Sequence, residues 1–229
     1  MALILQLETS TSSCSVSLAL NGEILALKEI NERNAHAIQL TLFIEEVMAA
    51  AGKTLKELDA VAVSMGPGSY TGLRIGVSTA KGLCYALDIP LIAINTLQAM
   101  ALGFKALRQD NSALYCPMID ARRMEVYSAV YNGQLEEVLP VEARIIDEQS
   151  FQALLAKQRI IFFGDGAMKC QEVLGSNANT VFVPDFLNSA KDLSALAFER
   201  FSNQQFEDVA YFEPYYLKDF LATQPRALK

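Results

Sequence analysis

Apolar and polar residues alternate with a period of two near the amino terminus. Every second residue from Cys14 to Leu20 is apolar, and the residues between them are small and mostly polar. This pattern predicts a strand with one side facing the core. A short apolar run predicts an earlier strand at 4–8. Asn21-Gly22 predicts a tight hairpin turn into a third strand at 23–29, because both residues accept positive φ.

The rest of the first half alternates helical and extended patterns. A helix is predicted over 35–51, with Asn34 as its N-cap and Gly52 directly after its end. The remaining predicted elements are a strand at 60–65, a helix at 73–87, a strand at 91–94 and a helix to about 107 capped by Thr96. The order is therefore β-β-β-α-β-α-β-α.

A polar stretch at 108–112 is the predicted domain boundary, and the second half repeats the order of the first. Its predicted elements are strands at 115–120, 125–131 and 134–139, with Asn132-Gly133 as a hairpin turn, a helix at 148–157, a strand at 160–163, a short helix after Gly166, a strand at 180–183 and a helix at 192–204. This duplication predicts a two-lobed actin-like (ASKHA) α/β fold with ribonuclease-H-like halves. The lobes are 1–108 and 109–229, and the sequence leaves open whether 211–229 pack back on the first.

Composition narrows the class of protein. The chain has 229 residues, of which 52% are hydrophobic and 20% charged, and this excludes a disordered chain. The net charge is −7 and no basic stripe is present, so we expect any contact with RNA to run through a partner. The start of the chain lacks a basic signal-peptide region, and no apolar stretch approaches a membrane span. We therefore expect a cytoplasmic protein without membrane contact.

Cysteine and histidine usage limits the chemistry further. The four cysteines are far apart, form no CxxC pair and are expected to be buried thiols. His36 is the only histidine, which excludes sites with two histidine ligands, so no metal site is predicted. His36 lies at the start of a predicted helix. It is either a packing or capping residue or a catalytic base. A catalytic role would need a nearby nucleophile and an orienting carboxylate, which the spacing of residues in the sequence does not reveal.

The segment Gly66-Pro67-Gly68-Ser69-Tyr70-Thr71-Gly72 joins a buried strand to a helix. It lacks the lysine of a Walker A loop, the third glycine of GxGxxG and the flanking glycines of GxSxG. Two interpretations stay open, a structural turn and an anion cradle at the helix start. The candidate anion or nucleotide contacts, which a partner would complete, are Gly66, Gly68, Ser69, Thr71, Gly72 and Arg74.

In the actin-like class, phosphate is held by glycine-containing turns, and here both equivalent turns lack glycine. They are the residues 8–13, which contain Glu8, and 120–123, which contain Asp120 and the pair Arg122-Arg123. The arginine pair is a candidate to hold a carboxylate instead of phosphate. Residues 164–167 loosely resemble the loop on the adenosine side. We therefore expect no nucleotide cofactor in the isolated chain.

Two predicted helices carry a second apolar or small face besides the one that covers the core. A helix lying on a sheet needs only one such face, and small residues let another helix come within about 8–10 Å. We infer a helix-to-helix protein interface, unless the chain's own segments cover these faces. The predicted interface residues are Ile38, Leu42, Ala49, Ile75, Ser78, Thr79, Gly82 and Ala86.

Several of these motifs together resemble the bacterial TsaB (YeaZ) family. The most specific is GPGSYTGLRIG within residues 58–87. The others are ILQLETSTSSCSVSL at the start, His36 with Leu40, Asp120-Ala121-Arg122 with Glu125-Val126-Tyr127, and Gly164-Asp165-Gly166. The resemblance runs from about residue 3 to 167. One departure is Glu8, where many relatives have aspartate.

The resemblance implies a role in placing threonylcarbamoyl on the adenosine next to the anticodon of certain tRNAs. It implies a non-catalytic paralogue of the transferase TsaD that serves as a scaffold. The implied partners are a TsaD-like paralogue bound through the first-lobe helices, a TsaE-like ATPase and a second copy of the chain. The chain would meet tRNA only through the complex, and ATP or ADP shared at the interface stays open. The alternative is an enzyme, an ATP-dependent phosphotransferase or an M22-type peptidase using Ser69, Thr71 or His36.

Overall fold

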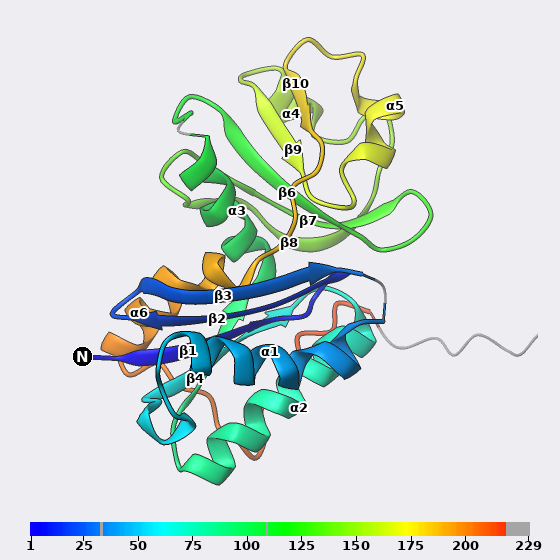
Figure 1. Cartoon of the computed structure of the whole chain (residues 1–229). Helices are drawn as coiled ribbons and strands as arrows, with labels where there is room; N and C mark the ends of the chain where they lie inside the picture. The colour runs from blue at the N-terminus through cyan, green and yellow to red at the C-terminus, as the bar shows by residue number, and fades with distance from the viewer. Residues whose placement is uncertain (33, 109, 219–229) are drawn as a thin grey trace, which may run out of the picture.

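Two five-stranded mixed sheets form two lobes, one above the other (Figure 1). The computed structural model describes residues 1–32, 34–108 and 110–218. The first sheet, in the order β3-β2-β1-β4-β5, contains β1 (Leu3–Glu8), β2 (Ser13–Leu20), β3 (Glu23–Asn31), β4 (Ala60–Gly66) and β5 (Leu91–Asn95). The second, in the order β8-β7-β6-β9-β10, contains β6 (Leu114–Asp120), β7 (Glu125–Tyr131), β8 (Glu137–Ile145), β9 (Ile160–Phe163) and β10 (Thr180–Val183).

Both sheets share one topology. The first three strands of each are antiparallel, and the fourth and fifth run parallel to the first. The helices are α1 (His36–Ala50), α2 (Tyr70–Leu87), α3 (Thr96–Leu107), α4 (Gln152–Leu155), α5 (Gln171–Leu174) and α6 (Ser194–Ser202), with short 3₁₀ turns η1 (Leu55–Glu57), η2 (Met168–Cys170) and η3 (Ala190–Leu193). This duplicated arrangement confirms the predicted two-lobed actin-like α/β fold.

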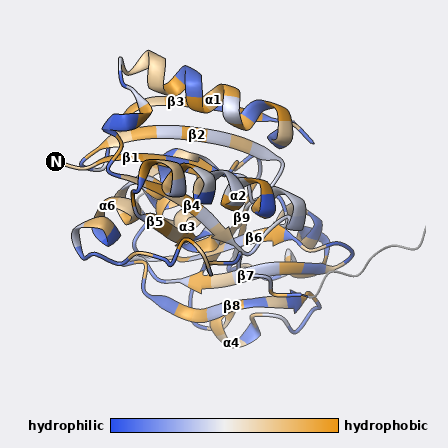
Figure 2. Ribbon diagram, turned by 90° about the horizontal axis from the view of Figure 1, so that it is seen from below, coloured by the Kyte–Doolittle hydropathy of each residue, from blue (hydrophilic) through white to orange (hydrophobic). Residues whose placement is uncertain are grey.

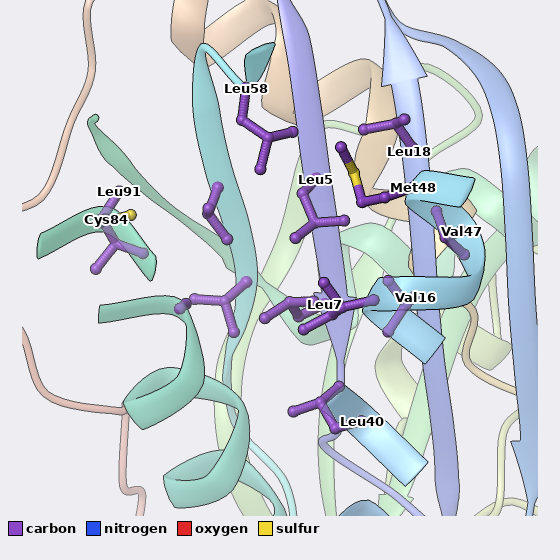
Figure 3. Close-up of a cluster of buried hydrophobic side chains, with 14 of the residues drawn as sticks. Leu5, Leu7, Val16, Leu18, Leu40, Val47, Met48, Leu58, Cys84 and Leu91 are labelled. Atoms are coloured by element: carbon purple, nitrogen blue, oxygen red, sulfur yellow. The ribbon is translucent and has the colours of Figure 1, made fainter. Parts of the chain in front are cut away.

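The outer face of the first sheet is covered by α1 and α2. Leu5 and Leu7 from β1 meet Val16 from β2 and Leu40 and Val47 from α1 in one buried cluster (Figure 3). The alternation along β2 therefore places its apolar side under α1, as predicted. Hydrophobic and hydrophilic positions are mixed along α1 and along strands such as β8 (Figure 2).

The last helix of each half lies in the seam between the two sheets. The α3 helix packs against the second sheet, and the Phe104 ring stacks on Phe163 of β9 with 4.0 Å between their centroids. The η3–α6 segment packs against the inner face of the first sheet, where Leu193 and Ala197 meet Ile4. Sequence periodicity predicted both helices, but it does not indicate which sheet a helix covers.

After α6 the chain returns along the first lobe. We call residues 203–218 the C-terminal strap. The Glu207 amide donates to the Leu91 carbonyl (2.9 Å), and the Tyr215 amide donates to the Met65 carbonyl (2.7 Å). Of the segment 211–229, residues 211–216 therefore lie on the first lobe, and Lys218 forms an ion pair with Glu125 of β7 across the cleft. Residues 219–229 are outside the described residues.

Local turn chemistry was predicted well at two places. Asn21 and Gly22 both have positive φ, 51° and 88°, and they form the hairpin turn. Gly52 has φ +62° just after α1, as a glycine that ends a helix does. No helix in the described ranges is long and apolar enough to cross a membrane.

Other local predictions were wrong. Asn34 is not the N-cap of α1, since Ala35 holds that position without a side-chain hydrogen bond. Asn95, not Thr96, caps α3, because the Asn95 carboxamide oxygen accepts from the Gln98 amide (3.1 Å).

The second half departs from its prediction in three places. The Asn132-Gly133 turn is longer than expected, since the Asn132 amide donates to the Glu136 carbonyl and Leu135 takes the positive φ. The strand predicted at 134–139 consequently begins later, as β8. The helix predicted over 148–157 shortens to the single turn of α4.

Candidate functional site

The predicted partner face lies on α1 and α2, which pack side by side on the first lobe (Figure 1). On α1, the Ile38 side chain is 68% exposed and Leu42 is 46% exposed, and Ala49 is exposed too. On α2, the predicted residues Ser78, Gly82 and Ala86 are exposed, whereas Ile75 and Thr79 are half-buried. We call these eight residues the α1–α2 face. Within the described ranges, the chain's own segments leave most of it open.

Gly82 lies at an open position of this face. A Cβ atom built on Gly82 would have no heavy atom within 4 Å, so nothing in the fold requires a glycine there. The Thr79 hydroxyl donates to the Ile75 carbonyl within the helix (2.9 Å), which satisfies its donor. The side chains at this point are small and their hydrogen-bond donor is already used, so the surface can accept a closely approaching helix.

Sequence reasoning missed an aromatic side chain beside this face. Tyr85 of α2 is 86% exposed, and Tyr211 of the C-terminal strap is 84% exposed. Between them, Lys81 donates to the carbonyls of Ala210 (3.2 Å) and Phe212 (2.9 Å). Exposed tyrosines are frequent in protein interfaces. The apolar periodicity gave no signal for Tyr85, because it lies outside both apolar stripes of α2.

The glycine-rich loop packs tightly against the turn between β1 and β2. The Ser69 amide donates to the Ser10 carbonyl (2.6 Å), and the Ser69 hydroxyl caps α2 by accepting from the Gly72 amide (3.3 Å). A Cβ on Gly68 would lie 2.4 Å from the Ser10 carbonyl oxygen, and one on Gly72 would lie 2.1 Å from that of Thr9. These glycines permit close backbone packing, which favours the structural interpretation of the loop.

The turn that would bind phosphate in an actin-like nucleotide site is occupied by its own side chains. The Ser10 amide donates to the Glu8 carboxylate (2.6 Å), and the Ser64 hydroxyl donates to the same oxygen (3.1 Å). The Thr9 amide donates to Ser64 (3.4 Å). Glu8 is 1% exposed, and burial raises the pKa of its carboxyl. Glu8 therefore organises the turn from inside rather than facing a ligand.

A cleft of about 1010 Å³ separates the two lobes. Four of the six predicted anion contacts line it, namely Gly68, Ser69, Thr71 and Gly72. The other two lie apart. Gly66 packs under the Tyr215 carbonyl, whose oxygen would lie 2.7 Å from a Cβ atom built on Gly66. The Arg74 guanidinium lies over the Tyr70 ring, 5.4 Å from its centroid, and donates to its hydroxyl (3.2 Å).

Acidic and basic groups of the second lobe form the opposite wall. The Asp120 amide donates to the Asp165 carboxylate (3.0 Å), and Asp120 forms an ion pair with Lys169. Burial, together with the neighbouring Asp120 charge, raises the pKa of Asp165. Arg122 has φ +72°, and its amide donates to Asp120 (2.9 Å). Within the described residues, the Asp120 carboxylate at this turn pairs with Lys169 rather than with the arginine pair, so a role of Arg122-Arg123 in holding a carboxylate stays a prediction.

His36 lies at the start of α1 and borders the cleft. Its ring is 7% exposed, and Nε2 is 3.1 Å from the Ser13 carbonyl oxygen. Because a carbonyl oxygen only accepts, Nε2 carries a proton and donates. This contact ties α1 to β2 and supports the packing interpretation of His36.

The chain matches known proteins over nearly its whole length. A family model described as TsaD, tRNA N6-adenosine threonylcarbamoyltransferase, matches residues 23–224. The tRNA threonylcarbamoyladenosine biosynthesis protein TsaB of Escherichia coli strain K12 is 31% identical over 230 residues, which cover 96% of each chain. TsaB of Bacillus subtilis strain 168 is 30% identical over 70% of this chain and 69% of the relative.

Solved structures agree with these matches. YeaZ from Pseudomonas aeruginosa superposes with a TM-score of 0.81 at 26% identity, covering 95% of this chain and 100% of the other. A crystal structure from the same organism, described as an uncharacterized protein with similarity to peptidase YEAZ, has a TM-score of 0.84 at the same identity and coverage. By sequence motifs, fold and full-length similarity, this chain belongs to the TsaB (YeaZ) family.

Proposed function

We propose that this chain is a non-catalytic binding subunit in tRNA threonylcarbamoyladenosine biosynthesis, and that it docks a TsaD-like transferase on the α1–α2 face. Membership of the TsaB family supports the role in this biosynthesis, since the curated relatives carry that name. The docking role is inferred from the chain's own surface.

The observation that carries the proposal is the open α1–α2 face. Ile38 and Leu42 of α1 are 68% and 46% exposed, and Gly82 of α2 is an open position. An apolar patch with small neighbours favours burial against a second helix pair. A paralogue with the same two-lobed fold would carry an equivalent pair of helices, and the two chains would then pack helix to helix.

The cleft supports a non-catalytic role. The amides of Thr9 and Ser10 already donate within the protein, and the proton on Nε2 of His36 is directed at a backbone carbonyl. A nucleophile and its base must lie within hydrogen-bonding reach of each other, and neither Ser69 nor His36 has such a contact with the other in the described residues. ATP or ADP would then be bound only where the partner completes the site.

Further partners follow from the same reasoning. A second copy of the chain would cover the α1–α2 face when the transferase is absent, and a TsaE-like ATPase would join the assembled pair. The net charge of −7 disfavours direct contact with phosphates, so tRNA would be held mainly by the partners.

A pair of matched variants tests the docking role. Ile38→Asp places a charge in the α1–α2 face, and Ile145→Asp places one on β8 at an equally exposed isoleucine, 71% against 68%. Binding to a TsaD-like protein is measured by calorimetry. We expect Ile38→Asp to weaken binding by about tenfold or more, because a buried charge loses its water, and Ile145→Asp to bind like the parent chain. Equal binding by both variants would contradict the proposal.

Gly82→Leu and Leu42→Asp give independent support. The Gly82→Leu side chain enters open space in the isolated chain, so the fold should survive, but it blocks the close approach of a partner helix. We expect both variants to lose co-purification with the partner while keeping their circular dichroism spectra. Unchanged co-purification would remove the helix-to-helix interface.

A further inference from the structure

The serine face of β2 forms a hydrogen-bonded seam with the segment that returns from the second lobe. The Ser13 hydroxyl donates to the Asn188 carbonyl (2.6 Å), and the Ala190 amide donates to the Ser15 hydroxyl (2.9 Å). The Asn188 carboxamide donates to the Ser10 hydroxyl (3.2 Å). The small polar residues that alternate along β2 therefore hold the returning segment 188–194, which we call the crossover.

Carboxyl groups gather at this seam. The Ser189 hydroxyl donates to the Glu29 carboxylate (2.7 Å), and Ser189 lies three residues before Asp192 in the crossover. Asp192 is half-buried and packs against Gly103 of α3, where a Cβ would lie 2.3 Å from the Asp192 carboxyl carbon. Glu8 lies fully buried on the same side of β1. Glu29 is therefore bonded to the crossover through Ser189, and both Glu29 and Glu8 lie near enough to repel an ionised Asp192.

Acidic groups outnumber basic ones around Asp192. The charged groups that act on it are Lys191 from its own element, Glu8 from β1 and Glu29 from β3. The neighbouring strands β2 and β4 contribute the neutral hydroxyls of Ser15 and Ser64, α3 contributes the backbone of Gly103, and α6 begins with the hydroxyl of Ser194. Lys191 is exposed and offsets only part of the repulsion.

We propose that this seam is a pH-sensitive joint between the lobes, held tight when the Asp192 carboxyl is protonated and loosened when it ionises. Ionisation adds a negative charge next to Glu29 and Glu8, and the new charge gains hydration if the crossover lifts from β2. Because the crossover links the second sheet to α6 on the first, its loosening frees the lobes to move relative to each other.

The direction in which the pKa of Asp192 is shifted agrees with this proposal. Burial, with repulsion from Glu8 and Glu29, raises the pKa of Asp192 to about 7, well above its ordinary value. When folding raises the pKa of a carboxyl group, the folded chain loses stability as the pH rises from the pKa of the unfolded chain to the pKa of the folded chain. The seam is therefore tight on the acidic side of neutrality and loosens as pH rises through neutrality.

Thermal unfolding and amide exchange of the full chain at about pH 6 and about pH 8 test the joint. The variant is Asp192→Asn, and the control is Asp185→Asn, an exposed aspartate in the same connection. In the parent and the control, we expect the melting temperature to be about 3–5 °C lower at the higher pH. Residues 188–194 should also exchange faster there, after correction for intrinsic rates. In Asp192→Asn, both differences should largely vanish.

An Asp192→Asn variant that keeps the parental pH dependence would overturn the proposal. Should that variant fail to fold, a carbon-13 titration of the aspartate carboxyls in the parent chain decides the matter. An Asp192 carboxyl that titrates in the usual acidic range would refute the joint, and one that titrates near neutrality would support it.

Discussion

The amide of Ser69 donates a 2.6 Å hydrogen bond to the carbonyl oxygen of Ser10, and this bond holds the glycine-rich loop on the β1–β2 turn. In an actin-like nucleotide site that turn faces phosphate, but here a neighbouring loop of the same lobe binds it. The glycines at 68, 72 and 76 each face backbone or side-chain atoms of Thr9 or Ser10 at less than 2.5 Å from a would-be Cβ. The glycines of the motif that marks the family are therefore explained by the close packing of this loop against the β1–β2 turn.

Replacing these glycines should reveal that role. Gly72→Ala would place a methyl group 2.1 Å from the Thr9 carbonyl oxygen, so the loop or the turn must move. We expect the free energy of unfolding to fall by about 2–4 kcal/mol. Urea denaturation monitored by circular dichroism measures the change.

Gly82→Ala is the matched control on the same helix. Its methyl group meets nothing within 4 Å, and alanine is the better helix former, so we expect a gain of about 0.5–1 kcal/mol. Equal changes in the free energy of unfolding at positions 72 and 82 would show that packing against the turn is not the reason why position 72 requires glycine.

The four thiols should be inert in the folded chain. All four cysteines are buried, and burial raises the pKa of Cys14 to about 11 and that of Cys84 to about 11. The reactive thiolate is therefore scarce at neutral pH. We expect a maleimide to leave the native protein unmodified by mass spectrometry and to add four labels after unfolding in urea. Rapid labelling of a native cysteine would contradict this burial.

The C-terminal strap should depend on Lys81. Its ammonium group donates to the carbonyls of Ala210 and Phe212, so Lys81→Met removes two hydrogen bonds to the strap. We expect protease cleavage between residues 206 and 216 to accelerate by about fivefold or more, a loss of about 1 kcal/mol in local stability. Lys56→Met, at an exposed lysine of η1, is the control and should leave the cleavage rate unchanged. Equal rates in both variants would mean that other contacts hold the strap.

Local chemistry made much of the fold predictable. The Asn21-Gly22 turn and Gly52 require positive φ, which few other residues accept, and strand alternation along β2 determines which side meets α1. By contrast, Leu135 takes positive φ in place of Gly133, and Asn95 caps α3 in place of Thr96. In both cases neighbouring residues could fill the same role, and the local sequence does not distinguish between them.

Contacts between segments that are distant in the sequence could not be predicted from the sequence alone. The apolar stripes of α3 and α6 have the same period whichever sheet they cover, so the pattern could not assign α6 to the first sheet. The spare faces of α1 and α2 were found because a helix on a sheet buries only one side. The exposed Tyr85 and the carboxyl groups around Asp192 were missed, because they depend on which segments meet in space.

Hydrogen exchange of the chain with and without a TsaD-like protein tests the docking face most directly. On forming the complex, amides of residues 36–50 and 70–87 should exchange more slowly, and those of the second sheet should be unchanged. Protection confined to the second lobe, with α1 and α2 unaltered in a saturated complex, would contradict the α1–α2 face as the site of docking.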